Sequence, residues 1–158
     1  NASPVEFAPI PAFAPEHFAA VRSIETSSYK SFGKGVAQLR EEGAVQVFYP
    51  WGSTRTEPIF AVVGELQFDV AKYRLETEYK VKTVLTRLPF SLVRHVQGEP
   101  ENVARMQLPS NAKLVEDWEG RAVALFESDW SLRLASEWNP ALTFARFSAD
   151  SSQEALAS

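Results

Sequence analysis

The chain has 158 residues, a formal net charge of −4 at pH 7, 45% hydrophobic residues and 23% charged residues. This length can bury a core as one domain or as two small halves, and the composition is typical of a soluble globular protein with no membrane partner. The sequence has no cysteine, which excludes disulfides, thiolate metal sites and cysteine nucleophiles and favours a cytoplasmic protein. The acidic balance argues against a domain that binds by covering nucleic acid phosphates.

The first predicted elements are a strand and a helix. Apolar residues alternate with prolines over residues 7–22, and we expect an edge-type strand there because proline cannot donate a hydrogen bond to a central ladder. From residue 27 or 28 the apolar residues recur at helical spacing, which predicts a helix that Gly43 ends. The apolar face of that helix comprises Tyr29, Phe32, Val36 and Leu39.

A hairpin, a second helix and a further strand complete the first half. The hydrophobic period changes from two residues to helical spacing after Gly64 and returns to two after about residue 80. This order is β-α-β-β-α-β, the pattern of ferredoxin-like folds. The predicted strands span residues 44–50, 59–63 and 81–88, and the helix spans residues 64–79.

The second half repeats the same order with weaker signals. We therefore expect an α+β fold of two linked ferredoxin-like units, with mainly antiparallel sheets and helices on one face. The predicted elements are strands at 90–96, 112–118, 121–127 and 141–147 and helices at about 100–106 and 129–138. The predicted organisation is a disordered or cloning-derived N-terminus at 1–6, a ferredoxin-like first half at 7–88, a smaller α+β second half packed on it at 89–148, and a flexible tail at 149–158.

Two helices have apolar residues that we expect to face the sheets. In the second helix these residues are Leu66, Val70 and Tyr73, and the face is widened by Phe68, Leu75 and Tyr79. Glu65 stands where an acid favours a helix start. In the last helix Asp129 is the expected cap. The predicted core face of that last helix comprises Trp130, Leu134 and Trp138.

The sequence gives little sign of catalysis or ligand binding. The stretch SFGKGV at 31–36 lacks the first glycine and the final hydroxyl of a phosphate-binding loop, so we expect no nucleotide in this chain, and Gly33 and Gly35 are expected to allow close packing of another element. The chain has only two histidines, which predicts no metal site. His17 beside Glu16 is either a surface residue or part of a hydrolase site.

The remaining candidates are residues for surface recognition. Tyr49, Trp51 and Arg55 lie in or beside a short predicted connection, and aromatic residues with arginine carry contact energy at many interfaces. Trp51 could equally cover the core between the halves. On predicted strands, Arg87, Arg94 and Arg146 either form a phosphate-contacting stripe or belong to a solvated face.

Three stretches resemble a known family: IPAFAPEHFAAVR, GKGVAQLREEGAVQVFYP and VVGELQFDVAKYRLETEYKV. They are similar to the C-terminal third of bacterial peptide chain release factor 3, a class II translational GTPase of termination. The resemblance runs from about Phe7 to about Phe147 and is densest up to Val81. Three places depart from the family pattern: SIETSS after Arg22 replaces a basic run, Tyr49 replaces a frequent arginine, and His95 replaces a tryptophan.

The resemblance implies a non-catalytic domain of a larger protein. The parent would bind GTP and magnesium in an N-terminal GTPase domain followed by a β-barrel domain, so no cofactor is expected in this chain. The domain would contact a small-subunit ribosomal protein and possibly ribosomal RNA, and also the GTPase and barrel domains of its parent. It would help couple GTP-dependent domain movement to the dissociation of class I release factors. The alternative is a ferredoxin-like regulatory or small-ligand-binding module.

Overall fold

The computed structural model describes residues 14–147, so the predictions for residues 1–6 and 149–158 lie outside the described part. The strands of the first unit, which we define as residues 14–88, are β1 (His17–Ser23), β2 (Gln46–Pro50), β3 (Ile59–Val62) and β4 (Thr83–Leu88). Its helices are a 3-10 turn (Thr26–Ser28), α1 (Tyr29–Glu41) and α2 (Leu66–Glu78). The second unit, residues 89–147, contains β5 (Leu92–Gln97), α3 (Pro100–Ala104), β6 (Ala112–Glu116), β7 (Ala122–Phe126), α4 (Asp129–Trp138) and β8 (Thr143–Ala145).

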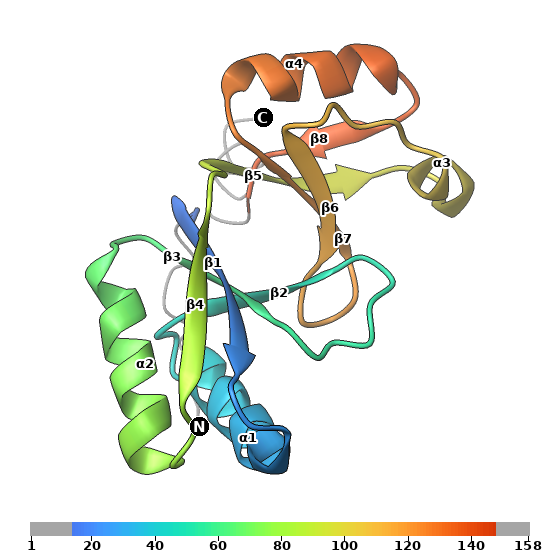
Figure 1. Cartoon of the computed structure of the whole chain (residues 1–158). Helices are drawn as coiled ribbons and strands as arrows, with labels where there is room; N and C mark the ends of the chain where they lie inside the picture. Colours follow the sequence, from blue (N-terminus) through green and yellow to red (C-terminus); the bar gives the residue numbers. More distant parts are fainter. Residues whose placement is uncertain (1–13, 148–158) are drawn as a thin grey trace, which may run out of the picture.

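The strands form an eight-stranded antiparallel sheet in the order β4-β1-β3-β2-β6-β7-β5-β8. Each unit places its own strands in the order fourth, first, third, second, so the two units meet through β2 and β6. At this junction Tyr49 pairs with Glu116 and Pro50 pairs with Val115. Figure 1 shows α1 and α2 beside the strands of the first unit and α3 and α4 beside those of the second. The predicted α+β fold of two ferredoxin-like units is confirmed.

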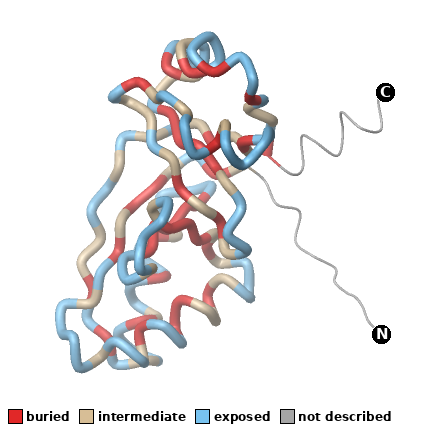
Figure 2. The backbone as a smooth tube through the Cα atoms, turned by 90° about the vertical axis from the view of Figure 1, so that its right-hand side faces the viewer, coloured by how far each residue is buried: buried red, intermediate tan, exposed pale blue. Residues whose placement is uncertain are grey.

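Three hydrophobic cores fill the spaces between the sheets and the helices and between the two units. Because successive side chains of a strand point to opposite faces, β1 directs Val21 toward the helices and Phe18 toward the second unit, where it packs with Val93 and Leu125. A third core lies under α3 and α4 and includes Phe126 and Ala135. Figure 2 shows the buried positions following the strands, with exposed positions in the connecting loops. Both faces of the first sheet are therefore covered, one by helices and the other by the second unit.

The first strand differs from its predicted position. β1 begins at His17, after Pro15, and pairs with β3 on one side and β4 on the other. The prediction of an edge strand is therefore wrong for the described residues. Because the paired segment contains no proline, each of its residues can donate to a neighbour, and the ferredoxin-like order places the first strand inside the sheet.

The helix faces also differ from the predictions. In α2 the exposed fractions are 78% for Leu66 and 67% for Tyr73, and the buried side chains are Phe68, Ala71 and Leu75. In α4 Trp130 is 63% exposed and Trp138 is 49% exposed, while Ser131 and Ala135 face the core. The expected inward positions of Leu66, Val70 and Tyr73 in α2 and of Trp130 and Trp138 in α4 are therefore wrong. Phe68 and Leu75, which were expected to widen the inward face of α2, are buried.

Two smaller predictions about helices have mixed outcomes. The cap of α4 is Ser128 rather than Asp129, because its hydroxyl accepts from the Ser131 N–H at 3.3 Å in a reciprocal capping box. The expectation of close packing is confirmed at Gly35, where an added Cβ would lie 2.5 Å from Leu75. It is wrong at Gly33, which has open space around it.

Candidate functional site

The loop at residues 51–58 joins β2 to β3 where the two units meet. The Trp51 N–H donates to the Leu114 carbonyl at 3.3 Å, and the Gly52 N–H donates to the Glu116 carboxylate at 3.3 Å. These bonds fix the start of the loop to the second unit. The Trp51 side chain remains 42% exposed, so it is a surface residue rather than a cover for the core between the units.

Arg55 points back into the molecule. Its backbone has a φ of 61°, and its guanidinium Nε donates to Glu116 Oε2 at 2.9 Å while Nη2 contacts the same oxygen. Nη1 also donates to the Trp118 carbonyl at 3.2 Å. The Glu116 side chain is only 15% exposed, so this pair is better shielded from water than a surface ion pair. Arg55 therefore joins the loop of the first unit to the β6–β7 turn of the second.

Two aromatic rings extend the same connection. Tyr49 is buried at 7% exposure in β2, with its ring 6.3 Å from that of Trp118 and with the Arg55 guanidinium 5.0 Å above it. Burial raises the pKa of the Tyr49 hydroxyl, and the positive charge of Arg55 partly offsets that effect. From α1, Arg40 lies 5.0 Å over the Trp118 ring and donates to Glu119 at 3.1 Å. We call this set of contacts the seam; its members are Arg40, Tyr49, Arg55, Glu116, Trp118 and Glu119.

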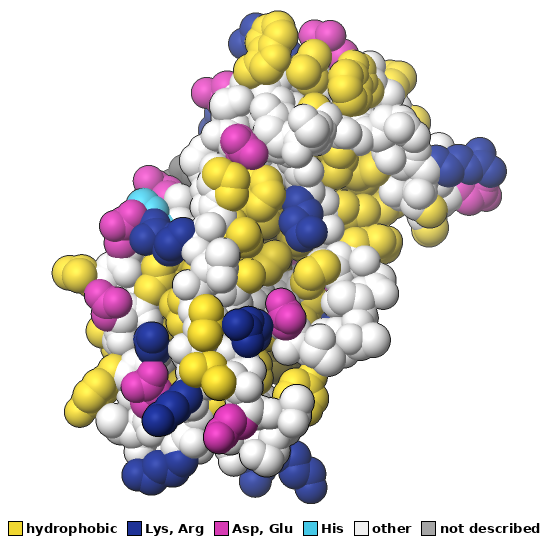
Figure 3. Space-filling model, viewed as in Figure 1, with side chains coloured by type: hydrophobic (Ala, Val, Ile, Leu, Met, Phe, Trp, Pro, Cys, Tyr) yellow, Lys and Arg dark blue, Asp and Glu magenta, His cyan; other side chains and the backbone are white. Residues whose placement is uncertain are grey.

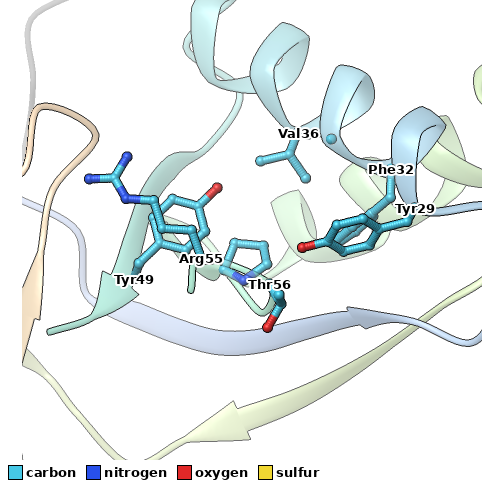
Figure 4. A pocket seen from close by; sticks show the side chains of 8 residues that line it. Tyr29, Phe32, Val36, Tyr49, Arg55 and Thr56 are labelled. Atoms are coloured by element: carbon cyan, nitrogen blue, oxygen red, sulfur yellow. The ribbon is translucent and has the colours of Figure 1, made fainter. Parts of the chain in front are cut away.

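A small pocket opens next to the seam, between α1 and the 51–58 loop. Its volume is about 100 Å³, well below the range for small-molecule sites. Figure 4 shows the Tyr29 and Phe32 side chains on one side of it and Tyr49 with Arg55 on the other. The pocket is lined by Tyr29, Phe32, Gly33, Val36, Tyr49, Arg55, Thr56 and Pro58. An apolar floor with a few polar groups at its rim suits a single protruding side chain of a protein partner.

Arg87 belongs to a different cluster, at the start of α2. It donates to the Glu65 carboxylate at 2.6 Å and lies 5.0 Å over the Phe68 ring. The hydrogen bond from Arg87 lowers the pKa of Glu65. His17 Nδ1 is 3.7 Å from the same carboxylate, so this histidine lies beside Glu65 at the start of α2. Arg87 is half exposed and could still reach a partner.

Arg94 lies in β5 of the second unit. Its Nη1 donates to the Val93 carbonyl at 2.8 Å, and the side chain is partly buried. In the strand order, five strands separate β5 from β4, which carries Arg87. The ring of the neighbouring His95 stacks on Phe147 at 4.5 Å, and burial lowers its pKa.

Other kinds of site receive no support between residues 14 and 147. No group of three or more His, Asp or Glu side chains in this part could hold a metal ion. No helix of this part is long and apolar enough to cross a membrane. Of the predicted contact residues, Tyr49 and Arg55 belong to the seam and Trp51 lies in the adjoining loop, while Arg87 and Arg94 lie elsewhere. Their contact with a partner stays a prediction.

Sequence reasoning missed the second-unit half of the seam. Glu116, Trp118 and Glu119 were read as parts of a strand and a turn, although Glu116 lies 61 residues from its partner Arg55. The available signal was the repeated β-α-β-β-α-β order, because two such units can pair through the same edge strand. That repeat predicts which strands meet, but it does not predict which side chains bond across them.

Comparisons with known proteins find one family and several of its members. The family model described as "Class II release factor RF3, C-terminal domain" matches residues 7–136. A peptide chain release factor 3 from Gloeobacter violaceus is 46% identical over 142 residues, which cover 89% of this chain and 27% of the relative. Those from Synechococcus elongatus and Symbiobacterium thermophilum are 45% and 44% identical, over 87% and 89% of this chain. The chain spans about a quarter of the length of the curated relatives it matches.

Proposed function

Because the chain belongs to the family of C-terminal domains of class II release factor RF3, we propose that it is the ribosome-contacting domain of a translation termination GTPase. The observation that carries the proposal is the extent of the family match, which covers the first unit and most of the second. In this proposal the domain makes and breaks no bond. GTP and magnesium bind elsewhere in the parent protein, which acts in the cytoplasm with the ribosome.

The seam supports a mechanical role for the domain. The shared core and the contacts of Arg40 and Arg55 with the β6–β7 turn bind the two units across the β2–β6 junction. In this proposal the two units therefore move together as one body, with no flexible hinge between them. In the proposed mechanism, GTP-dependent movement of the parent shifts this body against the ribosome and promotes the departure of a class I release factor.

The surface beside the seam is the proposed ribosome contact. Trp51 is exposed, and it belongs to the same 51–58 loop as Arg55 and Thr56, which line the apolar pocket. Exposed tryptophan is among the residues that contribute most to binding at interfaces. The pocket suits a side chain from a small-subunit protein, and the partly exposed Arg87 and Arg94 are candidates for further polar contacts, including phosphates of ribosomal RNA.

The test uses the full-length parent with a non-hydrolysable GTP analogue. We expect Trp51→Ala to weaken co-sedimentation with ribosomes by about thirtyfold, because hot-spot truncations cost about 2 kcal/mol or more and about 1.4 kcal/mol corresponds to tenfold. Trp130→Ala is the matched control, since it removes another exposed indole on the far unit. Arg55→Ala is a poor probe because it also breaks the seam. Equal binding by wild type and Trp51→Ala would remove this surface from the interface, and a loss with Trp130→Ala alone would move the contact to α4.

A further inference from the structure

Helix α2 carries apolar residues on two opposite faces. Phe68, Ala71 and Leu75 face the sheet and are at most 4% exposed. The outer face presents Leu66 and Val70, at 78% and 54% exposure, and Tyr73 one turn further. Residues spaced by three and four positions lie on the same side of a helix. We call Val63, Leu66, Val70 and Tyr73 the outer stripe.

The outer stripe presents four apolar side chains to water, each at least 46% exposed. Figure 3 shows hydrophobic side chains standing out at the left-hand edge of the molecule, over α2. An exposed apolar patch with a polar rim marks a contact site. Asp69, Lys72 and Glu76 border the stripe on one flank, and Arg74 borders it on the other.

The structure points to an occupant that is tethered nearby. The described chain enters the fold at the start of α2, because the Glu16 N–H donates to the Val62 carbonyl at 3.0 Å and His17 lies 3.7 Å from Glu65. Figure 1 shows the beginning of β1 and the beginning of α2 at the same end of the first unit. A polypeptide that leads into β1 therefore arrives beside Val63 and Leu66.

The size of the stripe also favours an occupant within the same protein. The stripe from Leu66 to Tyr73 is about 10 Å long along the helix. It is too small to supply the roughly 1,200–2,000 Å² that a stable complex of separate chains usually buries. A tethered segment needs less area, because the linkage gives it a high effective concentration.

We propose that the outer stripe is the docking surface for the part of the parent protein that precedes this domain. The family match describes a C-terminal domain, and the relatives are about four times longer than the matched region, so most of a relative precedes it. The surface of the parent that docks here is apolar. At its edge it carries groups that complement Asp69, Lys72 and Glu76, which border the stripe. This inference rests on the proposed function only in assuming that such a parent exists.

The test compares the 158-residue chain with its full-length parent. The chain has no cysteine of its own, so Val70→Cys introduces one thiol into the stripe, and Trp138→Cys places a control thiol on α4 at similar exposure, 49% against 54%. The rate of alkylation is followed at each position by peptide mass spectrometry. We expect labelling at position 70 to be about tenfold slower in the free parent than in the isolated chain, equivalent to about 1.4 kcal/mol of docking, with equal rates at position 138.

Each other result overturns the proposal. Equal rates at position 70 in both proteins would show an open stripe. Protection that appears only when ribosomes are added would assign the stripe to the ribosome, and protection of the isolated chain that grows with its concentration would assign it to a second copy. Ribosome binding by the parent with Leu66→Ser and Val70→Ser is measured separately. A parent that docks but does not bind ribosomes would contradict the proposed function and leave the docking intact.

Discussion

The two units share a strand order but cover their sheets with different helices. In the first unit α1 and α2 have 13 residues each, and both insert large side chains such as Phe32 and Phe68 into the core. In the second unit α3 has five residues and α4 has ten, and α4 faces the sheet with Ser131 and Ala135. The same topology thus receives a thick cover in one unit and a thin cover in the other.

The shared core compensates for the thin cover. Strands β5, β6 and β7 turn Val93, Val115, Val123 and Leu125 toward the first unit, and all four are at most 1% exposed. The small residues of α4 let the helix approach β7 closely, while the shared core supplies much of the apolar burial of the second unit. The two units are therefore expected to depend on each other for stability, and the predicted domain boundary at residue 88 remains a proposal.

The largest expected effect comes from truncating the shared core. Phe48 is 1% exposed, and its ring lies 6.0 Å from that of Phe147 in an edge-on contact. We expect Phe48→Ala to lower the free energy of unfolding by about 3–5 kcal/mol. Native-state hydrogen exchange should show faster exchange in β5 and β7 as well as in β1 and β3, because both units lose one core.

Phe126→Ala is the matched change in the core of the second unit, where Phe126 packs edge-on against Phe144 at 5.7 Å. It should cost a similar free energy. If Phe48→Ala left exchange in β5 and β7 unchanged, the units would be independent and the comparison above would fail.

A second prediction addresses the helix pair of the first unit. An added Cβ at Gly35 would lie 2.5 Å from Leu75 and 3.1 Å from Tyr79, and Leu75 is fully buried and cannot move aside freely. We expect Gly35→Ala to destabilise the protein by about 1–3 kcal/mol through overpacking. Urea unfolding measures the change.

Gly33→Ala gives the opposite expectation two residues away. An added Cβ there meets nothing within 4 Å, so the gain in helix propensity should stabilise the protein by about 0.5–1 kcal/mol. Destabilisation by both substitutions would show that α1 does not tolerate side chains on either face, and the specific contact with α2 would lose its support.

The order of the elements could be predicted from the sequence, because the spacing at which apolar residues recur changes clearly between strands and helices. The repeat of that order in both halves also predicted the fold. The faces of α2 and α4 were beyond this reasoning for different reasons. In α2 Leu66 and Phe68 belong to two opposite apolar faces. The helical spacing of apolar residues does not show which of these faces packs against the sheet. In α4 the largest residues, Trp130 and Trp138, are outside, while Ser131 and Ala135 are buried and Leu132 packs against the core.

The candidate site was only partly predictable for a similar reason. Local composition drew attention to Trp51 and Arg55, but it did not show that Arg55 bonds to Glu116 across 61 residues. An arginine in a polar loop has the same local pattern whether its guanidinium meets solvent or a carboxylate of another unit. Such long-range pairs depend on the geometry of the β2–β6 junction, which no local pattern encodes.

A third prediction concerns how the helices of the two units begin. Ser128 and Ser131 form a reciprocal capping box at α4, whereas Glu65 makes no side-chain cap at α2 and binds Arg87 instead. We expect Ser128→Ala to cost about 1 kcal/mol. Asp129→Asn should cost only about 0.3–1 kcal/mol, because it removes a charge near the helix N-terminus and leaves the cap in place. A larger loss with Asp129→Asn, measured by thermal unfolding, would restore Asp129 as the principal cap.

The smallest expected effect is a pH dependence in the first unit. Hydrogen bonds from Arg74 and Gln38 lower the pKa of Glu42 from its ordinary 4.5 to about 2. Because the folded state holds this proton less tightly than the unfolded state, the pair stabilises the protein fully above pH 4.5, and the stabilisation is lost as the pH falls toward 2. We expect Glu42→Gln to lower the midpoint of thermal unfolding slightly at pH 7 and to leave it unchanged near pH 2.

Glu41→Gln is the control for that measurement. It removes the same charge one residue earlier, and within residues 14–147 Glu41 makes no ion pair. Equal effects of the two substitutions at every pH would mean that net charge, rather than the bond from α2 to the end of α1, causes the change. If only Glu42→Gln lowers the midpoint of thermal unfolding at pH 7, then α1 and α2 are held together by the ion pair between Glu42 and Arg74 as well as by the packing at Gly35.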